Sequence, residues 1–332
     1  MNRTADGIVA AIGVAAGALA AATIVKATQS QDRQRRPGIA DTLGTARLVV
    51  APALQATRMG KKVDAHIHAA RAFNRSSALL AWSALADSAI EHYRGSFENR
   101  AMFAPLIVGT LSLAAGIHGG ADDMGSRHPL RNAIYLAAAG VGVAGTGFHL
   151  YNVTKRPGRF SWHNLFYGAP LGAPAALLLS GALGAVGERL RDEPAHDPRL
   201  FGMPAGKALA WVAAAGMIGT VGEVALLHFR GAFHNRVMYA PVTIPPIAAA
   251  LLARAALAPP RANRWTRFWL RVTAALGAIG VGFHIRGVAR NQGGWRNWSQ
   301  NVLNGPPLPA PPGFTALATA GLAALRLRET ER

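Results

Sequence analysis

The sequence predicts an all-α integral membrane protein with two tandem four-helix transmembrane repeats in parallel orientation, preceded by an N-terminal transmembrane helix. Of the 332 residues, 51% are apolar and only 15% are charged, whereas soluble domains average about 25% charged residues. The apolar residues gather in runs that are long enough to cross a bilayer. In addition, a polar motif occurs twice with a spacing of 136 residues.

The repeated motif reads HYRGSFENRAMFAP at residues 92–105 and HFRGAFHNRVMYAP at residues 228–241, with nine of fourteen positions identical. The duplication continues downstream, where Gly147-Phe-His149 matches Gly282-Phe-His284 and a Pro-rich segment after Asn164 matches one after Asn301. An internal repeat has to be recognised before domains are assigned. We therefore expect an N-terminal transmembrane helix with a basic cytoplasmic connector at 1–75, a first repeat at 76–190, a cytoplasmic linker at 191–207 and a second repeat at 208–328.

Eight apolar segments are the predicted spans of the two repeats: 76–92, 102–118, 132–150, 165–186, 208–228, 237–258, 267–285 and 308–325. A further apolar stretch at 7–25 is either a ninth span or a signal sequence. Its weakly charged start and the lack of a small-x-small cleavage site favour an uncleaved span. The spans are rich in Ala and Gly, which either permits close helix packing in lipid or reflects a compositional bias.

The net charge of +19 does not indicate nucleic-acid binding, because the basic residues are distributed by membrane side. With the first span included, 24 Lys and Arg fall on one side of the predicted topology and 11 on the other. The positive-inside rule then places the N-terminus in the periplasm and the C-terminus in the cytoplasm of a bacterial inner membrane. Because each repeat has an even number of spans, both copies enter the bilayer in the same orientation, related by a pseudo-twofold axis along the membrane normal.

Histidines end the first and third predicted helices of each repeat, on the side expected to be periplasmic. His92 and His149 belong to the first repeat, and His228 and His284 belong to the second. Two imidazoles on neighbouring helices are a common way to hold haem b, so these four are the candidate metal ligands if the first and third helices are neighbours. The alternative is that each histidine is an interfacial residue that bonds a carbonyl. Glycines on the third helices would leave room for a flat macrocycle (Gly142, Gly145, Gly147, Gly277, Gly280, Gly282).

Other duplicated residues accompany these histidines. Arg94 and Arg230 are candidates for binding haem propionates, because an arginine fork matches a carboxylate. Met102 and Met238 are less favoured candidate ligands for haem or a soft copper site, the alternative being ordinary packing. Gly95, like its counterpart in the second repeat, would permit a turn with positive φ.

Asp87 and Glu223 lie inside the first predicted span of each repeat, five residues before the histidine. A carboxylate within a span costs about 2.5–3.5 kcal/mol on insertion scales and generally faces a partner or a water-filled cavity. We expect each to accept a hydrogen bond from an imidazole N–H of another helix or to relay protons. The alternative is a buried carboxylate bonded to Ser or Trp side chains.

The two copies differ in places, for example at His118, which has no histidine counterpart. The chain has no cysteine, which excludes disulfides and thiolate chemistry, and it carries no hydrolase or nucleotide-binding signature. The leading hypothesis is a haem b-binding electron-transfer subunit that works with quinone and a periplasmic redox protein. The alternatives are a transporter or solute-binding membrane protein that uses the pseudo-twofold interface between the repeats, or a cofactor-free membrane anchor. Whether the protein is an enzyme is left open.

Overall fold

Helices make up nearly all of the secondary structure in the computed structural model. It describes residues 50–168, 170–261 and 263–331, with side chains from residue 65 onward. The predicted span at 7–25 lies outside the described residues. The long helices are α2 Val50–Arg94, α3 Ala104–Ala121, α4 Pro129–Thr154, α6 Gly172–Arg191, α7 Ala205–Arg230, α8 Ala240–Leu257, α9 Arg264–Arg290 and α11 Pro312–Thr330. Thus a long helix covers most of each of the eight predicted spans in the repeats.

Short elements join these helices. They are the 3-10 turns η1 Arg100–Phe103, η2 Arg236–Tyr239 and η3 Gly294–Asn297, the helices α5 Trp162–Tyr167 and α10 Trp298–Asn304, and the paired strands β1 Arg199–Leu200 and β2 Met203–Pro204. Asn99 and Asn235 cap η1 and η2 by accepting a backbone N–H two residues ahead. A proline near the start of the next helix follows in both places, where its missing N–H costs no intrahelical hydrogen bond.

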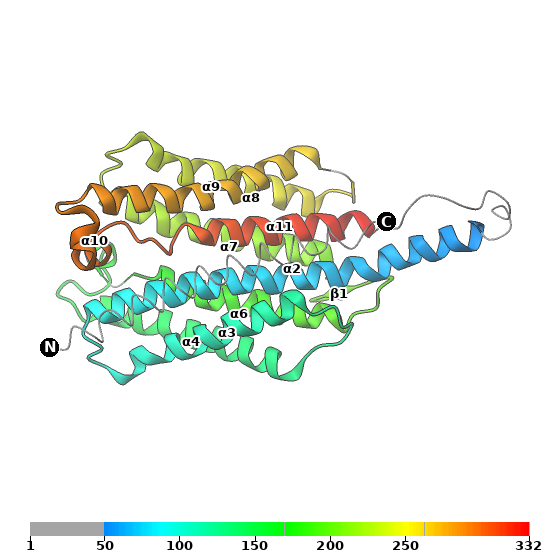
Figure 1. The fold of residues 1–332 in the computed structure, drawn as a ribbon, viewed down its shortest axis with the longest axis horizontal. Helices are drawn as coiled ribbons and strands as arrows, with labels where there is room; N and C mark the ends of the chain where they lie inside the picture. Colours follow the sequence, from blue (N-terminus) through cyan, green and yellow to red (C-terminus); the bar gives the residue numbers. More distant parts are fainter. Residues whose placement is uncertain (1–49, 169, 262, 332) are drawn as a thin grey trace.

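The helix α2 is longer than the span predicted for it. It runs without a break for 45 residues, and Ala69, Ala70 and Phe73 are buried in the main hydrophobic core. The segment before residue 76, which the sequence analysis assigned to a connector, is therefore helical from Val50 and packed against the bundle near Ala70. Figure 1 shows the start of α2 projecting past the other helices.

Two four-helix groups with the same order of contacts form the fold (Figure 1). In the first, α2 packs on α3 and α6, and α4 packs on the same two helices. In the second, α7 packs on α8 and α11, and α9 packs on these two as well. The groups meet mainly where α2 packs along α11. The haem hypothesis assumed that the first and third helices of each group are neighbours, but they face each other across a diagonal. The support that remains for a pair is the electrostatic proximity of its two histidines.

Lipid-facing and interior helices differ in composition. Among the described helices, five segments are long and apolar enough to cross a bilayer: Arg100–Ala121, Pro129–Thr154, Ala205–Arg230, Arg236–Leu257 and Arg264–Arg290. The remaining long helices α2, α6 and α11 carry more polar residues and lie at the centre of the contacts between helices. A helix surrounded by protein can carry polar side chains that pair with its neighbours. The faces that a helix exposes to lipid, in contrast, have to be apolar. The fold is thus that of an all-α protein suited to a bilayer.

Glycines bring the helices into close contact. A Cβ atom at Gly142 would collide with the backbone of Leu178 on α6, and one at Gly277 would collide with Thr315 on α11. Gly145 and Gly280 face Pro174 and Pro311 in the same way. Four of the six glycines expected to make room for a macrocycle are therefore covered by the fourth helix of their group, because backbones approach closely where side chains are absent. Gly147 and Gly282 have no atom near the Cβ position.

Candidate functional site

The duplicated polar residues gather at one end of the helices. The helices α2, α4, α7 and α9 end there, and α3, α6, α8 and α11 begin there. This is the end at which α10 lies in Figure 1, opposite the C-terminus. Counting the predicted spans placed the duplicated polar residues on one side of the membrane, and the directions of the helices agree with this.

The four candidate histidines all donate to backbone carbonyls through Nδ1. His92 donates to Met102 at 2.7 Å and His149 to Pro170 at 2.5 Å. A carbonyl oxygen can only accept, so the proton of each neutral imidazole resides on Nδ1 and the lone pair on Nε2. Both rings are half-buried, and their orientation is fixed by the loop that supplies the carbonyl.

The second group repeats this arrangement. His228 donates to Met238 at 2.7 Å, and His284 donates to Pro307 at 2.6 Å. In the described part of the chain, no hydrogen bond engages Nε2 of any of the four rings. His92 lies close enough to His149 for their charges to interact, and the same is true of His228 and His284. Each group thus presents two nearby imidazoles with available Nε2 atoms.

Each motif holds its histidine through backbone geometry and aromatic packing. Positive φ angles fall on Ser96 and Phe97, at 53° and 48°, and not on Gly95. The prediction that this glycine adopts positive φ is wrong. Its missing side chain makes room for the Met102 methyl group, which lies 3.3 Å from where a Cβ would be. The Phe97 ring stacks on Phe103 and meets His92 edge-on.

The other predicted binding residues already have protein partners. Arg94 forms an ion pair with Glu91 at 2.8 Å. Arg230 instead lies over the rings of Phe166 and Tyr167 from the first group. The contact of Met102 with His92 is made by its carbonyl oxygen. No described contact assigns a ligand role to the sulfur of Met102 or of Met238.

Asp87 and Glu223 do not accept the Nδ1 protons of the histidines, because carbonyls occupy that position. The Glu223 carboxylate instead lies beside the backbone of Gly172, at the start of α6. The two carboxylates, which belong to different groups, lie within electrostatic range of each other. They mark a polar location where the two groups meet.

Nowhere in residues 65–331, with their two single-residue gaps, do three or more His, Asp or Glu side chains gather to hold a metal ion. A mononuclear zinc or copper site made of protein ligands alone needs at least three of them. Haem iron is different, because the porphyrin supplies four nitrogens and the protein supplies only the axial ligands. The donor set of two free Nε2 atoms per group fits that requirement.

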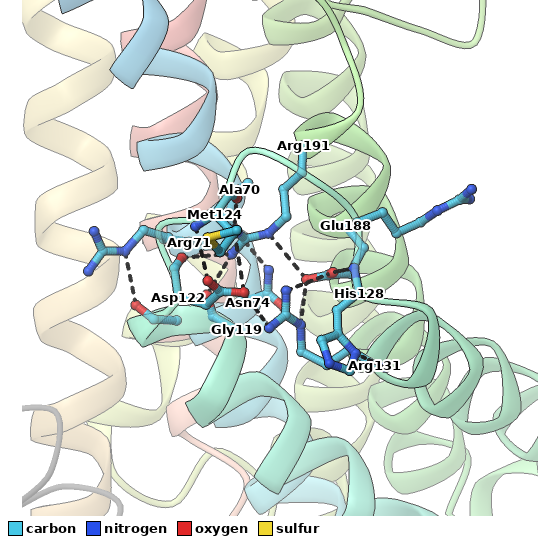
Figure 2. Close-up of polar contacts among 12 residues, drawn as sticks. Ala70, Arg71, Asn74, Gly119, Asp122, Met124, His128, Arg131, Glu188 and Arg191 are labelled. Carbon is cyan, nitrogen blue, oxygen red and sulfur yellow. Dashed lines mark hydrogen bonds and ion pairs between the residues drawn. The ribbon is translucent and has the colours of Figure 1, made fainter.

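A second polar site occupies the opposite end of the first group (Figure 2). The Glu188 side chain is fully buried and accepts two hydrogen bonds from the Arg131 guanidinium, both at 3.0 Å. It also accepts the backbone N–H of His128 at 2.9 Å and forms an ion pair with Arg191 Nε at 3.3 Å. The carboxylate is therefore matched by two buried guanidinium groups.

Asp122 completes this buried cluster. Its carboxylate accepts a hydrogen bond from Arg131 at 2.6 Å, while Arg191 donates to the backbone carbonyls of Gly119 and Asp122 at 2.7 and 3.1 Å. Desolvation raises the pKa of Asp122, but the Met124 amide and the two arginines outweigh it, so the pKa lies below its ordinary value. These ion pairs and hydrogen bonds hold together the end of α3, the start of α4 and the end of α6.

The second group has only part of this arrangement. Arg328 donates to the carbonyls of Ala255, Ala256 and Ala258 at the end of α8, as Arg191 does at the end of α3. The sequence spacing, however, places Leu325 at the position of Glu188 and Ala258 at that of Asp122. The cluster was not predicted, because these residues fall at or beyond the ends of the predicted spans. The signal was the pair Glu188 and Arg191, one helical turn apart in an apolar segment.

The fold and both sites define an all-α protein with several helices suited to crossing a membrane and polar groups at both ends of its bundle. Searches of protein-family models, curated proteins and solved structures found nothing that matches this chain.

Proposed function

We propose that the protein is a membrane electron-transfer subunit that binds haem b between His92 and His149 and between His228 and His284. The observation that carries this proposal is the hydrogen bonding of the four Nδ1 atoms to backbone carbonyls. Such a bond fixes the tautomer and orientation of a ligating imidazole. When bound, haem b would supply a one-electron redox couple.

The chain's own residues would do the positioning. The carbonyls of Met102, Pro170, Met238 and Pro307 would hold the rings, and the pairs would lie near one face of the membrane. Arg94 and Arg230 each follow a candidate histidine by two residues and would bind the propionates. To do so, Arg94 would have to leave Glu91, and Arg230 would have to leave the rings of Phe166 and Tyr167. Quinone in the bilayer and a soluble redox protein outside the membrane are the proposed electron partners.

The proposed arrangement places two parallel four-helix repeats about a pseudo-twofold axis along the membrane normal. It is supported by the equivalent histidine hydrogen bonds and by the equivalent contacts of Arg191 and Arg328. The excess of basic residues at the other ends of the helices favours a bacterial inner membrane, with the histidine end in the periplasm.

A reduced-minus-oxidised visible spectrum of the purified full chain in detergent, with metal analysis of the same sample, tests this proposal. We expect sharp α and Soret bands that are lost when His149 and His284 are both replaced by alanine. Replacing His163 and His234 is the matched control, since both are exposed at the same end and neither belongs to a pair. A colourless, iron-free protein, or bands equally lost in the control, would refute haem binding.

A second candidate function is proton-coupled transport. Asp87 and Glu223, from the two groups, lie within electrostatic range of each other, and carboxylates inside a membrane often belong to proton relays. If the protein is colourless, proteoliposomes with a trapped pH dye should report proton uptake that D87N/E223Q abolishes. Uptake that is unchanged in this variant would remove the candidate.

A further inference from the structure

A cavity of about 720 Å³ lies between the end of α8 and the start of α9. Its polar lining includes three arginines, Arg254, Arg261 and Arg264, and its apolar lining includes Trp265 and Phe268. It lies at the end opposite the histidines, where two of the apolar helices suited to crossing a bilayer, Arg236–Leu257 and Arg264–Arg290, have their other termini. The cavity is therefore placed at a level where lipid headgroups would be found.

Among the residues that the structure describes, no carboxylate pairs with the arginines that line this cavity. From residue 224 to 328 the chain contains twelve arginines and no Asp or Glu. The next two acids along the chain are already engaged, Glu329 with Arg267 and Glu331 with Arg328. No ion pair to the three cavity arginines occurs among the residues that the structure describes.

Comparison with the first group shows what is missing here. At the corresponding end of that group, Asp122 and Glu188 neutralise Arg131 and Arg191. In the second group these positions hold Ala258 and Leu325, and Ala258 lines the cavity. The nearby carbonyls of α8 are engaged by Arg328. Arg328, the counterpart of Arg191, is instead paired with Glu331. The charge without a described carboxylate partner is therefore that of Arg254, Arg261 and Arg264, which an anion from outside the chain would balance.

Aromatic residues indicate which anion fits. Trp265 is 73% exposed and Phe268 is 49% exposed, beside the arginines. Tryptophan is enriched where hydrocarbon meets headgroup, and arginine forks match phosphate oxygens. We propose that this cavity binds the phosphate of an anionic phospholipid headgroup, with the two aromatic rings against its glycerol and upper acyl carbons.

The test is native mass spectrometry of the full chain in detergent, titrated with phosphatidylglycerol, phosphatidylcholine or inorganic phosphate. We expect saturable binding of phosphatidylglycerol that is weakened in the triple variant R254Q/R261Q/R264Q. Each basic residue near an anionic headgroup is worth about fivefold in affinity, so the triple change should weaken binding by roughly a hundredfold. The control R189Q/R271Q/R326Q removes the same charge from exposed arginines at the same end and should bind as the unaltered protein does.

Three outcomes would overturn the proposal. They are unaltered binding in the cavity variant, an equal loss in the control variant, and saturation by inorganic phosphate that displaces the lipid. Equal affinity for phosphatidylcholine would also contradict it, because the zwitterionic lipid brings no net charge. If the triple variant fails to fold by circular dichroism, R261Q alone, in the exposed loop between α8 and α9, gives the same test with an expected loss of about fivefold.

Discussion

Replacing Glu188 by leucine removes the carboxylate on which the buried cluster depends. Glu188 is fully buried, accepts three hydrogen bonds and pairs with two guanidinium groups. Removing one partner of a buried ion pair costs about 3–5 kcal/mol, because the remaining charge stays desolvated. Asp122 still contacts Arg131, so we expect about 3 kcal/mol for E188L, at the lower end of that range.

A second substitution tests whether the cost comes from charge or from packing. In R131M/E188L both charges are gone, methionine fills part of the space left by arginine, and Arg191 keeps its carbonyl acceptors, as Arg328 does in the second group. Replacing a buried ion pair by apolar residues is often nearly neutral. The double variant should therefore be more stable than E188L, with an interaction energy of about 2 kcal/mol between the two sites.

The free energy of unfolding can be measured on the full chain in mixed micelles by titrating SDS and following helicity by circular dichroism. R189L, an exposed change on the same helix, is the control and should lie within about 0.5 kcal/mol of the unaltered protein. A cost below about 1 kcal/mol for E188L, or costs of the two substitutions that simply add, would refute the view that Glu188 compensates buried charge.

Two further predictions concern pH and helix contact. Because the folded pKa of Asp122 lies below its unfolded value of 3.8, its stabilising contribution is fully present above that pH and is lost as the pH falls through the folded pKa. The free energy of unfolding, measured from about pH 6 down to about pH 2, should show this loss in the unaltered protein and a smaller loss in D122N. Separately, G142A should cost about 1–3 kcal/mol by forcing α4 away from Leu178. G140A, which meets no atom within 4 Å, should be neutral or stabilising by up to about 1 kcal/mol, and equal effects of the two would contradict the contact.

Much of the helical layout follows from local sequence information. Apolar runs of membrane length, prolines at helix starts such as Pro105 and Pro241, and the duplicated motif place the helices and bring their polar ends to one side. The lateral order of the helices does not follow from such information. It depends on contacts such as Gly142 with Leu178, between residues 36 positions apart in the numbering, and no periodicity within one helix encodes them.

The two polar sites also differ in how far local sequence information predicts them. The histidines were recognisable because a costly polar group recurs at equivalent positions, whereas their acceptors, such as the carbonyl of Pro170, belong to backbone that carries no side-chain signal. The ionic cluster had one local signal, the pair Glu188 and Arg191, but the contact between Arg131 and Glu188 joins residues 57 positions apart and had none. Each looks by itself like a solvated residue at a helix end, and only the convergence of three helices buries them.

The uninterrupted helix α2 has a mechanical consequence. Its 45 residues correspond to about 67 Å of rod, roughly twice the hydrocarbon thickness of a bilayer. His92 lies near one end of α2, and the start of the helix projects past the other helices (Figure 1). A change of ten degrees in the tilt of the whole helix would displace one end relative to the other by about 12 Å. A helix of this length therefore extends well beyond the hydrocarbon layer that the apolar helices are suited to cross.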